Sequence, residues 1–430
     1  MRSFSEIFRD TAATLLLMFT AVLATSCGGS QVDGDSAVLR AVPSRAVAVA
    51  HFGRLDKALE MLTDSTSLFR QLDYGPYHDS EMSFSYVYSA SLVPVLVIDA
   101  GHAGRDTSSQ ALKVLDNAQG CGLSAAYAQE STKKRALLII STLRAAVNES
   151  LVHISENSSI LDAPGFTQAL GSAEGKAGIL LLRGSAAHRW MPKGFLADIF
   201  PRSSLVRFAE SYSEWISAGF DEYSLSRASL GFLQDPAFGH FCAVPQAVER
   251  GKSKLHTVLP EDYLFALDLP LQDLDAYQKA YHHYLDVKAV LSVNKIRCRQ
   301  MESRCGVSPI AWAKGIGLKE IALIAFPGGK VLALRGARKQ ARQGEIQQNS
   351  CPGASALLFG TAFALEDESG MLSSGHWLFI GSEDALEAFS AAAKGVRAES
   401  FPDKECKFAV CTPGWQIAAD GDKIGLNIWN

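Results

Sequence analysis

The stretch Val42–Phe52 (VPSRAVAVAHF) and the stretch Leu259–Leu269 (LPEDYLFALDL) share one layout, and this recurrence decides the predicted fold. Each begins with an apolar residue and a proline, continues through two polar-biased positions, and ends in an apolar run typical of a strand. Leucines at helical spacing follow the first run, and Leu271–Leu285 has the same spacing after the second. The sequence therefore predicts a strand followed by a helix at both places.

A second recurrence follows the first in each half of the chain. Leu137–Ser141 (LLIIS) and Leu378–Ser382 (LFIGS) are apolar runs that end in serine, and each precedes an amphipathic helical segment. Because the two recurrences come in the same order, we predict two related α+β units with mostly antiparallel sheets and packed helices. Chance similarity between strand–helix segments is the alternative explanation.

These patterns give a provisional division of the chain. The first α+β unit is expected at 42–250 and the second at 256–430. Residues 27–41 begin with a polar, Gly-rich run and are expected to form a flexible tether, preceded by a signal peptide at 1–26. Within the first unit, the aromatic-rich segment Phe195–Ser217 has a helical pattern.

The N-terminal segment carries an apolar run, Thr11–Ala24, which is shorter than the roughly 20 residues that span a bilayer core. Small residues then lead directly into Cys27, which glycines follow. This arrangement resembles the lipobox of bacterial lipoproteins of the Bacteroidetes type. The resemblance implies export, a lipid such as palmitate on Cys27, and anchoring in the cell envelope at the outer membrane, facing the periplasm or the surface. An ordinary cleaved signal peptide and an uncleaved anchor helix are the alternatives.

The composition narrows the class of protein further. The apolar content of 47% with 20% charged residues is typical of a globular chain, and about 400 residues after the leader suit two domains. The formal net charge of −4 offers no basic footprint. We therefore expect no nucleic-acid partner, and a membrane association that depends on the N-terminal lipid.

Eight cysteines are present. With Cys27 lipidated, an odd number remains, so at least one thiol is unpaired. In an exported protein, Cys298 with Cys305 and Cys406 with Cys411 could each close a short disulfide loop. Neither spacing is that of a structural zinc site, so we expect no metal there.

Known catalytic motifs are largely missing from the sequence. There is no Gly-x-Ser-x-Gly elbow, and Ser131-Thr132-Lys133-Lys134 lacks the companion motifs of acylating penicillin-binding enzymes. The best polar cluster is Asp99, His102 and Asp106, which follow a predicted strand and could form a site, although a solvated loop is the simpler interpretation. We expect no cofactor.

Three further segments resemble a group of uncharacterised envelope lipoproteins that carry domains of unknown function. They are the Pro-strand-helix openings at Val42–Leu55 and Leu259–Leu274, and Gly381-Ser382-Glu383-Asp384-Ala385-Leu386. The counterpart in the first half, Ile140–Ala146, departs from this last pattern because it lacks the glycine. The resemblance implies an envelope location and no established activity.

Two functions are compatible with the sequence. The first is a non-catalytic envelope lipoprotein that binds or scaffolds an envelope protein or a glycan. The second is an envelope hydrolase or glycan-processing enzyme whose site is not recognised, in which His102 would be essential. A deep pocket with convergent polar groups would favour the second, and an apolar cleft would favour the first.

Overall fold

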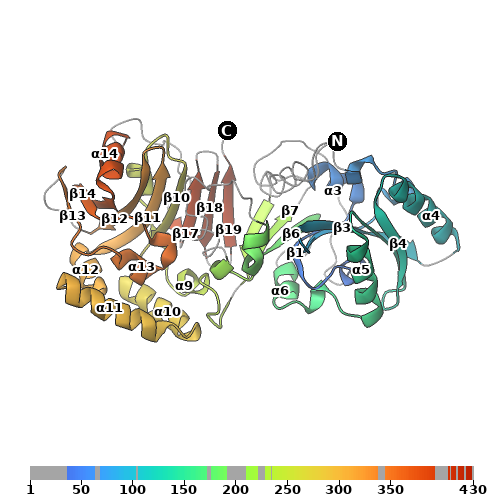
Figure 1. Ribbon diagram of the computed structural model, residues 1–430, viewed down its shortest axis with the longest axis horizontal. Helices are drawn as coiled ribbons and strands as arrows, with labels where there is room; N and C mark the ends of the chain where they lie inside the picture. Colours follow the sequence, from blue (N-terminus) through green and yellow to red (C-terminus); the bar gives the residue numbers. More distant parts are fainter. Residues whose placement is uncertain are drawn as a thin grey trace. The chain divides into compact units, whose positions relative to one another are not determined.

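The computed structural model describes residues 36–62, 68–102, 105–171, 176–190, 210–220, 228–233, 235–337, 344–392, 405–406, 408–412, 415–420 and 423–428 (Figure 1). The chain divides into two compact units. Among the described residues, the first unit contains those up to 190 together with 214–233, and the second contains 210–213 and those from 235 onwards. Residues 235–250, which the sequence analysis placed in the first domain, thus pack with the second unit.

The first unit is an antiparallel sheet covered by helices. Its strands lie in the order β4-β5-β3-β2-β1-β6-β7-β8. Their bounds are β1 Ala46–Phe52, β2 Met82–Tyr88, β3 Leu92–His102, β4 Ser124–Glu130, β5 Arg135–Ser141, β6 Gly178–Arg183, β7 Trp215–Phe220 and β8 Ala228–Phe232. The prediction that Phe195–Ser217 is helical is therefore wrong at its C-terminal end, since Trp215 begins β7.

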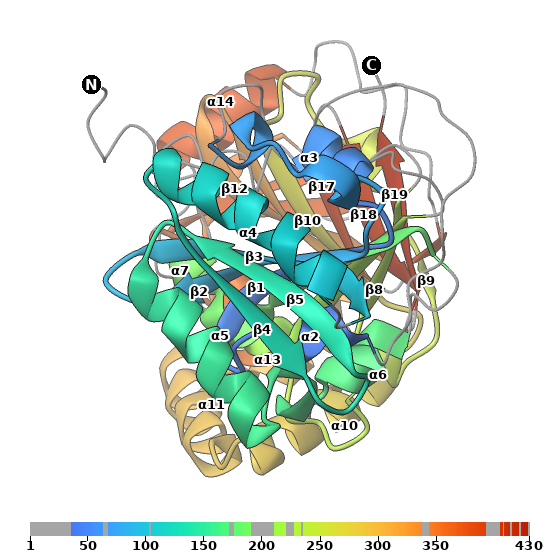
Figure 2. The same ribbon diagram turned by 90° about the vertical axis from the view of Figure 1, so that its right-hand side faces the viewer.

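Both faces of this sheet are buried. One face packs on α2 (Ala37–Arg40), α5 (Arg144–Glu156) and α6 (Phe166–Gly171), which share one apolar core with the strands. The views in Figures 1 and 2 place α3 (Leu55–Leu62) and α4 (Arg105–Gly120) on the opposite face. The central strand β1 is buried along its whole length as a result. Shorter helical turns complete the unit: η1 Leu68–Gln71, η2 Gly75–Tyr77, η3 Ile160–Asp162, η4 Gly184–Ala186 and α7 Ala187–Trp190.

The second unit repeats this plan. Its main sheet has the order β13-β14-β15-β12-β11-β10-β17-β18-β19, again antiparallel throughout. The bounds are β10 Phe265–Pro270, β11 Leu318–Phe326, β12 Gly329–Gly336, β13 Ile346–Gln348, β14 Gly370–Ser374, β15 Trp377–Gly381, β17 Phe408–Thr412, β18 Trp415–Asp420 and β19 Lys423–Ile428. A separate short pair joins β9 (Gly251–Lys252) to β16 (Glu405–Cys406).

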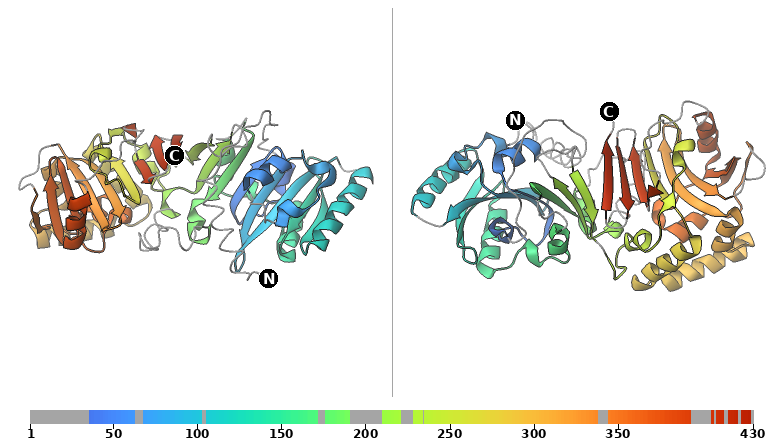
Figure 3. Two further views of the ribbon diagram at one scale, coloured as in Figure 1. Left: turned by 90° about the horizontal axis from the view of Figure 1, so that it is seen from above. Right: turned by 180° about the vertical axis from the view of Figure 1, so that it is seen from behind.

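Helices also cover both faces of the second sheet (Figure 3). One face packs on α14 (Glu383–Ala392) in a single apolar core. The other face carries a cluster of helices drawn in yellow and orange in Figure 1. These are α10 Leu274–Val287, α11 Leu291–Cys305, α12 Pro309–Ile316 and α13 Ala354–Phe359, with α9 Ala243–Gln246, η6 Leu255–Thr257 and η7 Thr361–Phe363 as shorter pieces.

The strand orders match, except that β13 at the edge of the second sheet has no counterpart in the first. In both units, the first strand of the main sheet (β1 or β10) lies at its centre. The second and third strands continue on one side of it, and the last three strands continue on the other. The first sequence recurrence falls on β1 and β10, and the second on β5 and β15 with the helices α5 and α14 that follow them. The predicted α+β class with two related, mostly antiparallel units is confirmed.

A glycine at the start of β6 lets the first sheet close against its aromatic core. Gly178 pairs with Phe52 of β1, and a Cβ built on Gly178 would lie 1.9 Å from Phe52 Cδ1. The Phe52 ring also stacks on Phe220 at 5.8 Å between centroids, so it has little room to move away. A side chain at position 178 is therefore incompatible with this packing.

We expect Gly178→Ala to lower the free energy of unfolding by about 1–3 kcal/mol, because the added methyl group must displace a buried ring. Gly120 is the matched control, since it lies at the exposed end of α4 and a Cβ there meets nothing within 4 Å. Gly120→Ala should leave stability unchanged or raise it. Equal denaturant midpoints for the two variants would contradict the prediction.

Candidate functional site

The candidate site of the second unit is built on α10. Asp273 begins this helix by accepting hydrogen bonds on Oδ1 from the backbone N–H of Asp275, at 2.8 Å, and of Ala276, at 3.2 Å. The spacing of Tyr277, Tyr281 and Tyr284 puts all three on the buried face of the helix. Their rings stack in sequence, with centroids 6.1 Å apart in both steps. The helix therefore presents a rigid column of tyrosines.

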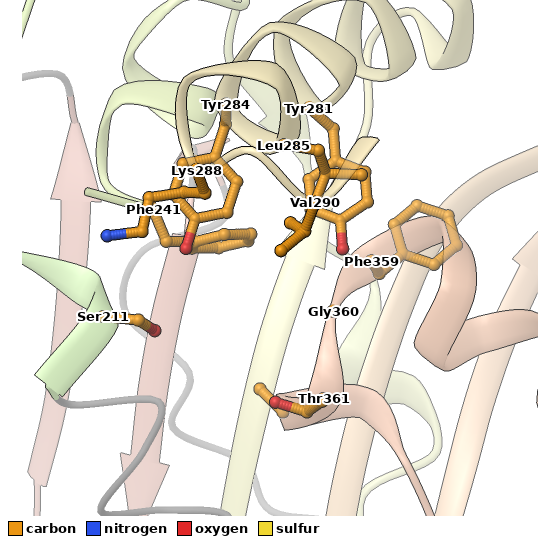
Figure 4. A pocket seen from close by; sticks show the side chains of 11 residues that line it. Ser211, Phe241, Tyr281, Tyr284, Leu285, Lys288, Val290, Phe359, Gly360 and Thr361 are labelled. Carbon is orange, nitrogen blue, oxygen red and sulfur yellow. The ribbon is translucent and has the colours of Figure 1, made fainter. Parts of the chain in front are cut away.

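A pocket of about 330 Å³ opens beside Tyr281 and Tyr284, at the C-terminal end of this column (Figure 4). Its walls come from α10, from the turn into α11, from the segment that joins α13 to η7, and from two residues near α9. They are Ser211, Phe241, Tyr281, Tyr284, Leu285, Lys288, Val290, Phe359, Gly360, Thr361 and Ala362. The volume lies at the lower end of the range for small-molecule sites, which are typically aromatic with a few placed polar groups.

The aromatic walls hold one another in place. The Phe241 ring meets Tyr281 and Tyr284 edge-on, at 6.3 Å and 5.9 Å between centroids. Two backbone hydrogen bonds fix the neighbouring segment, because the N–H of Phe241 donates to Ser211 O at 2.7 Å and the N–H of Cys242 donates to Tyr212 O at 2.8 Å. The Tyr284 hydroxyl in turn hydrogen-bonds the Ser211 hydroxyl. The pocket is therefore preformed rather than assembled by its ligand.

The far wall depends on a glycine. Gly360 follows α13 with φ 91° and ψ 170°, a backbone conformation that is accessible almost only to glycine. A Cβ at this position would lie 3.7 Å from Tyr281 Oη and 3.9 Å from Phe241 Cε2. The bare backbone of Gly360 thus leaves the space in front of the Tyr281 hydroxyl open.

Hydrogen-bond donors dominate the polar surface of the pocket. Burial raises the pKa of both Tyr281 and Tyr284, so their hydroxyls stay protonated across the physiological range. Figure 4 shows both hydroxyl oxygens reaching from α10 towards the pocket, with Thr361 on the opposite side. Lys288, which is exposed, brings an ammonium group to the rim. The site is suited to a ligand that offers oxygen acceptors to these donors.

A second polar cluster lies inside the sheet of the same unit. Asp268 of β10 and Glu320 of β11 are both completely buried. The Ser253 hydroxyl bridges them, at 2.7 Å from Asp268 Oδ2 and 3.1 Å from Glu320 Oε1. Glu320 also pairs with Arg335 and accepts from the backbone N–H of Lys254 at 2.9 Å. The cluster links β10, β11 and β12 to the segment that precedes η6.

The two carboxyl groups of this cluster share one negative charge. Burial first, and then the charge of Glu320, raise the pKa of Asp268 well above its usual range. Burial also raises the pKa of Glu320, but Arg335 opposes this and favours its ionised form. Asp268 has no cation of its own and its Oδ1 accepts no hydrogen bond. We conclude that Asp268 carries the proton and that the cluster is structural, because no part of it is open to solvent except Arg335.

The first unit has a counterpart at the same position. Phe52 pairs with Met82 in β1–β2 as Leu269 pairs with Ile321 in β10–β11, so the preceding residues His51 and Glu81 correspond to Asp268 and Glu320. His51 is fully buried, and its Nε2 lies 2.7 Å from Glu81 Oε1. Ser36 and Ser253 also correspond. Each of these two hydroxyls accepts from the backbone N–H two residues later, at 3.3 Å.

The structure describes the side chains of two of the three polar residues predicted as a site. Asp99 is buried in β3, where it forms an ion pair with Arg135 at 2.7 Å and accepts from the N–H of Gly101 at 2.8 Å. His102 is exposed at the end of β3. Asp106 belongs to α4, but its side chain lies outside the described residues, as does Cys27. Asp99 thus has a structural role, and the three-residue cluster stays a prediction.

The expected disulfide between Cys298 and Cys305 is wrong, because both thiols are free. The two residues lie seven positions apart on α11, which is about 10.5 Å along a helix axis, whereas a disulfide needs Cα atoms within about 7 Å. Cys298 instead contacts Asn294 Oδ1 at 3.6 Å. The side chains of Cys406 and Cys411 lie outside the described residues, so that pairing stays a prediction.

Sequence reasoning missed the tyrosine pocket. The helical recurrence of Tyr277, Tyr281 and Tyr284 was available as a signal, but a buried aromatic stripe is more often core than site. The other walls, such as Phe241 and Gly360, come from segments far from α10 in the sequence. Only the fold brings them together.

No protein-family profile, curated protein or solved structure matches this sequence. Within the described ranges, no set of three or more His, Cys, Asp or Glu side chains is placed to hold a metal ion. Among the same residues, no helix has the length and apolarity needed to cross a bilayer. The resemblance to envelope lipoproteins therefore depends on the sequence motifs alone.

The buried carboxyl of Asp268 predicts a pH dependence of stability. Its pKa is higher in the folded than in the unfolded chain, so its contribution is complete below about pH 4 and is lost as the pH rises through the folded pKa. The loss reaches at most about 1.4 kcal/mol per pH unit. Asp268→Asn, which cannot ionise, should raise the melting temperature at pH 8 and change it little at pH 4.

The exposed carboxylate Glu261 supplies the control for this experiment. Glu261→Gln should shift the melting temperature equally at both pH values. If the curves of Asp268→Asn and the parent protein run parallel between pH 4 and pH 8, Asp268 does not carry the buried proton.

Proposed function

We propose that this protein is a non-catalytic binding protein of the cell envelope, held at a membrane by a lipid on Cys27, and that the tyrosine pocket of the second unit holds its ligand. The observation that carries the proposal is the composition of the pocket wall. Aromatic rings, protonated hydroxyls and one rim ammonium can bind and orient a molecule. They offer no poised general base or activated nucleophile for a hydrolytic step.

The chemistry of the wall indicates the class of ligand. Stacked and edge-on rings favour a flat apolar face, and the Tyr281 and Thr361 hydroxyls favour oxygen acceptors. Lys288 adds a preference for negative charge at the mouth of the pocket. We infer a small ring-containing carboxylate, for which 2-naphthoate is a simple probe. A neutral sugar, which the envelope would also supply, is the competing ligand class.

The hydroxyl of Tyr281 should contribute directly to binding. Tyr281→Phe removes one hydrogen bond in the pocket and should weaken 2-naphthoate binding by about 2–10-fold in calorimetry. Tyr277→Phe is the matched control, because Tyr277 belongs to the same ring stack but its buried hydroxyl has no partner and does not line the pocket. Equal affinity for both variants would place the ligand elsewhere.

Lys288 should determine the preference for charge. Lys288→Ala should weaken 2-naphthoate by about 2–5-fold, the usual range for a solvent-exposed ion pair, and leave the uncharged 2-naphthamide unaffected. Tighter binding of methyl glycosides than of either naphthalene compound would instead establish a sugar site.

The anchor is supported by the apolar run Thr11–Ala24 and the small residues before Cys27. Cells that express the chain and are fed a labelled fatty acid should incorporate the label, and Cys27→Ala should abolish it and release the protein from the membrane fraction. Cys121→Ala is the control, since Cys121 is an exposed free thiol. Label that persists in Cys27→Ala would contradict the anchor without affecting the pocket.

A further inference from the structure

Two cysteines that are distant in the sequence lie near each other in the second unit. Cys305 is the last residue of α11, and Cys351 lies three residues before α13. The Cys305 thiol lies near enough to that of Cys351 to raise the pKa of Cys351. Cys351 is fully buried, whereas Cys305 is half-buried. Neither was paired with the other in the sequence analysis, because nothing in the spacing relates them.

The surrounding structure holds this pair together from several sides. Asn294 Nδ2, near the start of α11, donates to Leu357 O of α13 at 3.1 Å. Met301 Cε would lie 3.4 Å from a Cβ at Gly353. Beyond Cys351, the backbone N–H of Gly353 donates to Glu368 Oε2 at 2.6 Å. α11 is therefore held in a fixed packing on the segment that leads into α13 and carries Cys351.

We propose that Cys305 and Cys351 are a disulfide-forming pair, which closes into a covalent link between α11 and α13 when the protein meets a small disulfide oxidant such as oxidised glutathione. The two thiols lose two protons and two electrons and gain one S–S bond. One molecule of glutathione disulfide takes up the two protons and the two electrons and leaves as two molecules of glutathione. This inference does not depend on the proposed ligand or on the lipid anchor.

The environment of each thiol sets the order of the steps. The half-buried Cys305 is the accessible member, so its thiolate attacks the glutathione disulfide first and releases one glutathione. Cys351 then displaces the second glutathione. Burial, which remains after Cys305 has reacted, raises the pKa of Cys351, so its thiolate is scarce at neutral pH. The second step is therefore slow, and the mixed disulfide at Cys305 should accumulate before it closes.

The link would join α11, which directly follows one residue of the pocket wall, to α13, which ends in another. Val290 leads into α11, and Phe359 and Gly360 end α13. Closing the loop of chain between Cys305 and Cys351 constrains the unfolded state. The oxidised full chain should therefore melt at a higher temperature than the reduced chain, by about 5 °C.

The test is peptide mapping of the full chain after incubation with reduced or oxidised glutathione at pH 8, with free thiols blocked by iodoacetamide. We expect a linked peptide pair containing Cys305 and Cys351 only in the oxidised sample. Cys305→Ser and Cys351→Ser should each abolish it. Cys298→Ser, on the same helix but in contact with Asn294, should retain it.

Three results would overturn the proposal. They are alkylation of both thiols in the oxidised protein, a glutathione adduct on Cys305 that never closes, and a link from Cys305 to any other cysteine. Because the mapping is done on the parent chain, the answer does not depend on whether the serine variants fold.

Discussion

The central strand of each sheet is the constraint on which the rest of the structure depends. β1 pairs with β2 on one side and with β6 on the other, and β10 pairs likewise with β11 and β17. In both units, the second partner comes from more than a hundred residues further along the chain. The sheets therefore close only after long-range pairing, and helices on both faces leave the central strand fully buried.

Full burial explains why the same place in both units carries a polar pair. A polar side chain on a central strand must find its partner inside the protein, because an unpaired buried charge costs several kcal/mol. The first unit uses a histidine and a glutamate, His51 and Glu81. The second uses two carboxyls, Asp268 and Glu320, and compensates with Ser253, Arg335 and a retained proton. The scaffold has thus kept the position of the polar pair while its chemistry diverged.

The sequence predicted the scaffold well and the site poorly, for a physical reason. Strand and helix periodicity is local, so the recurrences at Val42–Phe52 and Leu137–Ser141 were enough to identify two related units. Pairings between distant segments leave no local trace. The approach of Cys305 to Cys351 and the packing of Phe241 on α10 depend on tertiary structure. In the segment expected to be helical, strand pairing with β6 prevailed over helical spacing at Trp215.

The position of the pocket explains why the sequence predicted the scaffold but not the site. Between their first two strands, the units differ most, because the first has the short α3, η1 and η2 where the second has α10, α11 and α12. Those added helices supply the tyrosine column, the rim lysine and one of the paired cysteines. A site built on an insertion is not recorded in the repeated segments, which report only what both units share. Function in this protein therefore has to be sought where the two halves of the sequence cease to resemble each other.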